Sequence, residues 1–136
     1  MSNWRTAKLN TLNNVEEPFL SQALDAMGYY ANPDDHVVNG SYSFDGNRQA
    51  DVVLYTKNGE KANIGFVFHG QENGTVSMDI VCDWYNKGSY KDFEDKFTVE
   101  YNTAKFRDVA ARNNFVVENE VDQVNGGRRM VLRKAA

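Results

Sequence analysis

The sequence predicts a single α+β domain in which an antiparallel sheet carries two helices on one face, in the order β-α-β-β-β-β-α-β-β. Segments with alternating apolar and polar residues run from residue 37 to residue 84, and Asp-Gly or Asn-Gly dipeptides separate them. A stretch with helical spacing of apolar residues precedes this series, another follows it, and a hairpin pattern closes the chain.

Length and composition predict one domain over residues 1–136, because no linker, repeat or low-complexity block interrupts the chain. The single cysteine permits no internal disulfide, and no basic segment precedes an apolar run near the N-terminus. We therefore expect a cytoplasmic setting without a membrane span. The formal net charge of -4 disfavours broad contact with phosphates, so nucleic acid is not the expected partner.

The first elements are a strand over Trp4–Leu9 and a helix whose apolar residues recur at helical spacing. Asn14 is the expected N-cap, Pro18 lies in the first turn, and Gly28 ends the helix. A loop with the sequence YANPDD follows at residues 30–35.

Four antiparallel strands in a meander explain the alternating segments, because Asn-Gly and Asp-Gly favour tight hairpin turns. The expected strands are Val37–Phe44, Gln49–Thr56, Ala62–His69 and Thr75–Trp84, with turns at Asp45-Gly46, Asn58-Gly59 and Asn73-Gly74.

A second helix is expected over Ser89–Asn113, with a break near Thr98 where its apolar stripe changes phase. A hairpin then joins FVVENEV to RRMVLRK through Asn125-Gly126-Gly127, and its basic last strand has the pattern of a charge-protected edge. Apart from this hairpin, the order is similar to that of helix-grip and TATA-binding-protein-like folds, an analogy that carries no function.

Alternation assigns the side chains of the two central strands to opposite faces of the sheet. One face is the expected core beneath the helices; it carries Ala62, Ile64, Phe66, Phe68, Ile80, Cys82 and Trp84. The other face carries an apolar patch of Val53, Tyr55, Val67, Val81 and Tyr85, with a polar rim of Asp51, His69, Asp79 and Asp83.

The apolar patch supports our leading hypothesis, a non-catalytic binding or assembly module that uses the sheet face opposite the helices. The expected partner is another protein or a second copy of the chain. The alternative for this face is that the termini of the chain, the first strand or the last hairpin, cover it.

A second hypothesis is a small-ligand protein or enzyme with a site around Asp51, His69, Asp79 and Asp83. Pairing through the Asn73-Gly74 turn places His69 opposite Met78 or Asp79, which supplies two metal ligands but no visible third. We therefore expect no metal and no cofactor. No phosphate loop, cysteine pair or nucleophile elbow is present, and this favours a protein without catalytic activity.

Three further residues have ordinary structural interpretations. Cys82 alternates with Ile80 and Trp84, so it is expected to be a buried core residue whose surroundings disfavour the thiolate. Trp84 is likewise expected in the core. His36 follows Pro-Asp-Asp and is expected in a turn.

Several short motifs resemble a family, the hypothetical chloroplast open reading frame number thirty-five of cyanobacteria, plastids and other bacteria. They are Met27-Gly28-Tyr29 at the end of the first helix, ADVVL at 50–54, NIGF at 63–66, IVCDWY at 80–85, YNTAKFRDVAARNNFVV at 101–117, and MVLRK near the C-terminus. The chain departs from the family pattern at Asn63, Cys82 and Tyr85, where aspartate, alanine and tryptophan are common. The resemblance implies one domain in a bacterial cytoplasm or plastid stroma, and it implies no activity.

Overall fold

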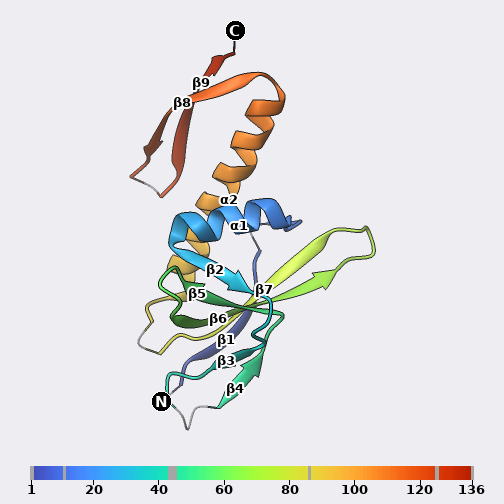
Figure 1. Cartoon of the computed structure of the whole chain (residues 1–136), viewed down its shortest axis with the longest axis vertical. Coiled ribbons are helices and arrows are strands. Elements are labelled where there is room, and N and C mark those ends of the chain that lie inside the picture. Colours follow the sequence, from blue (N-terminus) through green and yellow to red (C-terminus); the bar gives the residue numbers. More distant parts are fainter. Residues whose placement is uncertain (1, 11, 43–45, 86, 125, 136) are drawn as a thin grey trace.

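A computed structural model describes residues 2–10, 12–42, 46–85, 87–124 and 126–135, and it shows the predicted α+β class (Figure 1). The order of strands and helices is consistent with the predicted one, but six strands rather than four lie between the two helices, and some boundaries differ. The elements are β1 (Trp4–Lys8), α1 (Glu17–Met27), β2 (Tyr29–Asn32), β3 (Val37–Asn39), β4 (Asn47–Gln49), β5 (Val52–Thr56), β6 (Lys61–Gly70), β7 (Val76–Asp83), α2 (Tyr90–Arg112), β8 (Phe115–Asp122) and β9 (Arg128–Lys134).

The main sheet has the strand order β1-β7-β6-β5-β2, and each strand is antiparallel to its neighbours. Both helices contribute to the core on one face of it, as predicted. Ile80 and Cys82 are fully buried in this core, and the ring of Phe66 packs edge-on against Phe97 of α2 with centroids 5.8 Å apart. Ile64 and Trp84 are also buried, whereas Phe68 is only partly covered.

The predicted strand Val37–Phe44 is shortened to β3, which pairs with β4 in a second, two-stranded sheet. The predicted strand Gln49–Thr56 is divided: Gln49 ends β4, and Val52–Thr56 form β5 of the main sheet. The chain changes its hydrogen-bonding partner after Gln49. The Ala50 N–H donates to the carbonyl of His36, and the Asp51 N–H donates to the carbonyl of Phe66. Alternation continues through this change of partner, so the sequence pattern does not reveal it; Phe44 and Asp45 of the predicted strand and turn lie outside the described residues.

Helix α1 begins with Pro18 in its first turn and ends at Gly28, whose φ of 88° is the left-handed conformation that glycine adopts without strain. Its N-cap is Glu16 rather than Asn14. Asn14 instead joins the helix entry to the sheet, because its side-chain oxygen accepts a hydrogen bond from the Val76 N–H at 2.8 Å. The strand β2 follows at once and occupies part of the predicted loop.

Helix α2 is continuous over 23 residues, so the predicted break near Thr98 is absent. Ser89 caps its N-terminus by accepting the Asp92 N–H at 3.0 Å. The apolar stripe changes phase because the two halves of α2 have different neighbours: the first half packs under the sheet, and the second half runs out beside β8 and β9 (Figure 1). No helix in the described part of the chain is long and apolar enough to cross a lipid bilayer.

The C-terminal hairpin of β8 and β9 is a separate sheet at the far end of α2 (Figure 1). We call residues 105–136 the arm and residues 1–104 the body. A backbone hydrogen bond joins the end of β9 to the segment that follows α2: the Ala135 N–H donates to the carbonyl of Asn114 at 2.7 Å. Its predicted turn is in the expected place, and Asn125 within it lies outside the described residues.

Candidate functional site

The sheet face opposite the helices is largely covered, which corrects the expectation of an exposed apolar patch there. Val53 and Val81 are 0% and 2% exposed. Val53 belongs to a small second core with Val38 of β3 and Ala50, which follows β4. The internal β3–β4 hairpin therefore provides most of the cover, which the sequence did not suggest. Trp4 of the first strand also packs against this second core.

Gly65 of β6 permits this close cover. A β-carbon at this position would lie 2.6 Å from the side chains of both Ala50 and Val38, which is closer than real contacts allow. Asn63 fastens the cover at its other end: the residue adopts a left-handed φ of 55°, and its side-chain oxygen accepts the Asn39 N–H at 2.9 Å. Asparagine tolerates this conformation better than most residues.

The remaining patch residues, Tyr55, Val67 and Tyr85, are half-buried. The hydroxyl of Tyr55 donates to Asp35 at 2.7 Å, and the Lys61 ammonium lies 3.0 Å from the same carboxylate oxygen. Burial acts to raise the pKa of Asp35, but the bonds from Tyr55 and Lys61 outweigh it and hold that pKa below its usual value. This cluster anchors the loop before β3 to the sheet.

His69 and Asp79 form a direct pair on the two central strands, with Nε2 2.9 Å from Oδ2. The strand register places His69 opposite Ser77 and Asp79 opposite Val67, so the pair is diagonal rather than directly opposed. Asp51 accepts the Phe68 N–H instead of joining the pair. Among the described residues, no group of three or more His, Cys, Asp and Glu side chains could hold a metal ion.

Asp83 is fully buried and serves as an acceptor for three backbone N–H groups. They belong to Asn3 at 2.6 Å, Ser41 at 3.1 Å and Tyr85 at 3.2 Å. Burial acts to raise the pKa of Asp83, but these three donors outweigh it, so the pKa lies below its usual value. The carboxylate joins three chain segments and is not placed to act with His69.

Cys82 has the properties expected of a structural thiol. It is fully buried, and burial raises its pKa to about 12. A thiol of this kind is protonated at neutral pH and is a poor nucleophile.

The arm carries the largest group of exposed apolar side chains. No described residue of β8 or β9 is fully buried, although a two-stranded hairpin alone is marginally stable in water. The strand register puts Val116, Val121 and Val131 on the hairpin face that points away from α2, with exposed fractions of 40%, 40% and 36%. Phe106 and Val109 of α2 are 43% and 47% exposed.

Charge also distinguishes the arm from the body. The arm carries seven Lys and Arg against four Asp and Glu, whereas the body carries eight against fifteen. Sequence reasoning treated RRMVLRK as an ordinary edge strand and missed this surface. Two signals could have indicated it: the opposite charge balance of the two parts, and the change of phase in the apolar stripe of α2.

A family model described as "Protein of unknown function (DUF1257)" matches residues 23–131. The match begins inside α1 and ends in β9, so it includes the β3–β4 cover, α2 and most of the arm. No curated protein and no solved structure matches the chain.

Proposed function

We propose that this chain, which belongs to the family described as "Protein of unknown function (DUF1257)", is a non-catalytic assembly module that associates with a second copy of itself through the arm. One observation carries the proposal. None of the described residues of the projecting hairpin is fully buried, and the outer face of the hairpin presents three valines. A cytoplasmic or plastid-stromal setting, which the resemblance to the chloroplast open reading frame family implies, is part of the same proposal.

Packing within the arm is incomplete, which supports the need for a partner. An open groove of about 490 Å³ lies between α2 and β9, and its lining includes Val99, Phe106 and Met130. Two ion pairs join the hairpin to α2: Arg107 pairs with Glu120, and Arg128 lies 2.6 Å from Glu100. Burial of the remaining apolar surface against another molecule would stabilise the arm, because exposed apolar patches of this kind are typical of interfaces.

The opposite charges of arm and body favour a second copy as the partner. With a net charge of +3 on the arm and -7 on the body, the arm of one copy is attracted to the body of another. A two-fold arrangement in which each arm lies on the opposite body uses this attraction twice and closes the assembly. Nucleic acid fits less well, because five of the seven basic side chains of the arm are already in ion pairs.

Sedimentation velocity of the wild type and of Val121→Asp tests the proposal. We expect a dimer for the wild type, weakened at high salt because ions screen the attraction between arm and body. Val121→Asp is expected to be a folded monomer, because its carboxylate lies in solvent in the monomer and would be buried in the interface.

Val67→Asp is the matched control, since it places the same charge on the sheet face covered by β3 and β4. Each variant is first shown to unfold cooperatively. If the wild type is a monomer at all salt concentrations, self-association is refuted. If folded Val67→Asp dissociates while Val121→Asp remains a dimer, the interface lies on the sheet face and the arm is excluded.

A further inference from the structure

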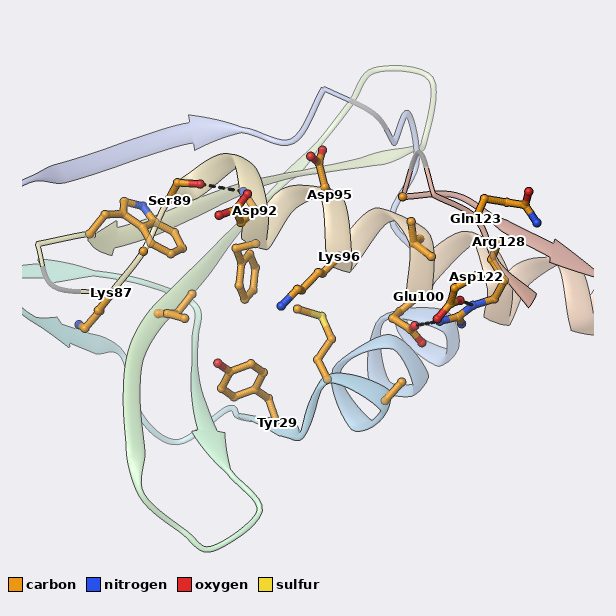
Figure 2. A pocket seen from close by; sticks show the side chains of 18 residues that line it. Tyr29, Lys87, Ser89, Asp92, Asp95, Lys96, Glu100, Asp122, Gln123 and Arg128 are labelled. Atoms are coloured by element: carbon orange, nitrogen blue, oxygen red, sulfur yellow. Dashed lines mark hydrogen bonds and ion pairs between the residues drawn. The ribbon is translucent and has the colours of Figure 1, made fainter. Parts of the chain in front are cut away.

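An open groove of about 900 Å³ lies between the end of α1, the first half of α2 and the base of the hairpin (Figure 2). One face of α2 forms its wall, because Asp92, Phe93, Lys96, Val99 and Glu100 recur at helical spacing and all line it. Its volume is in the range that holds small organic ligands.

The inner surface of the groove is apolar and rich in aromatic rings. Trp84 and Phe93 lie with ring centroids 5.9 Å apart, and Tyr29 and Phe93 with centroids 6.4 Å apart. Met27 and Ile64 complete this surface. Faces and edges of several rings at one site are suited to a flat, apolar molecule.

Ion pairs offset part of the acidic charge around the groove, whose lining holds four acidic and three basic side chains. Arg128 lies 2.6 Å from Glu100 and 2.8 Å from Asp122, and Asp95 is paired with Lys91 at 2.8 Å. The fourth acid, Asp92, lies in the first turn of α2, where the positive end of the helix stabilises a carboxylate.

The basic side chains, in contrast, leave positive charge available. Lys87 and Lys96 form no ion pair with any residue that the structure describes. Figure 2 shows the Lys96 ammonium directed into the groove from α2, with the hydroxyl end of Tyr29 directed into it from the opposite wall. An anionic group of a ligand could therefore pair with the Lys96 ammonium inside the groove.

Trp84 supplies a second indication of a ligand. Its side chain lines the groove and is 95% buried, yet its indole N–H has no hydrogen-bond acceptor among the described residues. A buried donor without an acceptor is unfavourable, so an acceptor brought by a bound molecule would be stabilised there. Because the atom is closed to solvent, neighbouring side chains must shift slightly to admit that acceptor.

We propose that this groove binds a small aromatic carboxylate, with its ring against Tyr29, Trp84 and Phe93 and its carboxylate bound to Lys96. The site is separate from the outer hairpin face that we propose for self-association. Arg128, at the start of β9, lines the groove as well, so residues of both the body and the arm form the groove.

Two-dimensional ¹⁵N NMR of the full chain, titrated with 2-naphthoate, tests this inference. The chain has two tryptophans, so two indole N–H signals are expected, and Trp84→Phe identifies one of them. We expect the Trp84 signal to shift in a saturable way. Lys96→Gln is expected to weaken binding about tenfold, the usual scale for losing one charge-assisted hydrogen bond.

Lys105→Gln is the control, because it makes the same change on the same helix at an ion-paired residue outside the groove. Uncharged 2-naphthamide should bind the wild type about as weakly as the carboxylate binds Lys96→Gln. Absence of a saturable Trp84 shift with 2-naphthoate overturns the proposal, and so does equal binding of acid and amide. The titration is repeated with Val121→Asp, whose substitution lies outside the groove. Binding of 2-naphthoate by this variant tests the groove independently of self-association.

Discussion

Substitution of Asp83 by asparagine removes the charge on which three chain segments converge. The side chain is fully buried and accepts backbone N–H groups from Asn3, Ser41 and Tyr85. Asparagine keeps one oxygen, and its NH₂ group faces donors where the second carboxylate oxygen was an acceptor. Since a hydrogen bond to a charged group contributes about 1.5–3 kcal/mol, we expect Asp83→Asn to lower the free energy of unfolding by about 2–4 kcal/mol.

Thermal and urea unfolding at neutral pH measure this loss, which corresponds to a fall in Tm of roughly 10 °C for a chain of this length. Asp51→Asn is the control on the same sheet face, because Asp51 is exposed and accepts one N–H from Phe68. We expect that control to cost about 1 kcal/mol or less.

The pH dependence of the free energy of unfolding gives a second measurement. It distinguishes the loss of a charged acceptor from the loss of a buried side chain of the same shape. The folded-state pKa of Asp83 is below its usual value, so its contribution is fully present above the unfolded-state pKa of about 4 and is lost as the pH falls toward the folded-state value. The difference in stability between the wild type and Asp83→Asn should therefore shrink below about pH 4. A difference that stays constant down to pH 2 to 3 would refute the assignment of Asp83 as a charged acceptor.

Two other substitutions test the two sides of the main sheet. Gly65→Ala should destabilise the protein by about 1–3 kcal/mol, because its methyl group would overlap Ala50 and Val38 and displace the β3–β4 cover. Increased amide hydrogen exchange confined to β3 and β4 would support this prediction. Unchanged exchange together with unchanged stability would contradict it. Phe66→Ala empties a fully buried position under α2 and should cost about 3–5 kcal/mol in urea unfolding. An unchanged midpoint would count against the assigned core face.

Local chemistry explains the parts of the fold that the sequence predicted. Alternation around Phe66 and Cys82 identified the helix-facing side of the sheet, because successive side chains of a strand point to opposite faces. Gly28 and Ser89 marked helix ends through backbone conformations and cap bonds that depend on a few neighbouring residues. The turn that joins their strands predicted that His69 and Asp79 lie close together, although the observed register, with His69 opposite Ser77, makes the contact diagonal.

The candidate sites depended on contacts between residues far apart in the chain, and these were not predicted. Asp83 was expected on an open rim of the sheet face. Its oxygens instead accept N–H groups from residues 80 and 42 positions away, so the side chain is a buried structural acceptor rather than a surface acid. The groove was not anticipated, since its lining comes from α1, α2 and the hairpin, which are distant in sequence.

The sequence by itself determined the α+β class, the order of the main strands and helices and which face of the main sheet packs under the helices, because these properties repeat with the local period of the backbone. Only the tertiary structure decided what covers the second face and what remains exposed. A strand can change its hydrogen-bonding partner after Gln49 without any change in alternation, and the final hairpin has the same pattern whether it extends the sheet or projects on α2. Packing between segments that are distant in the sequence decides both features, and such packing produces no periodic pattern of residues that could be recognised in the sequence.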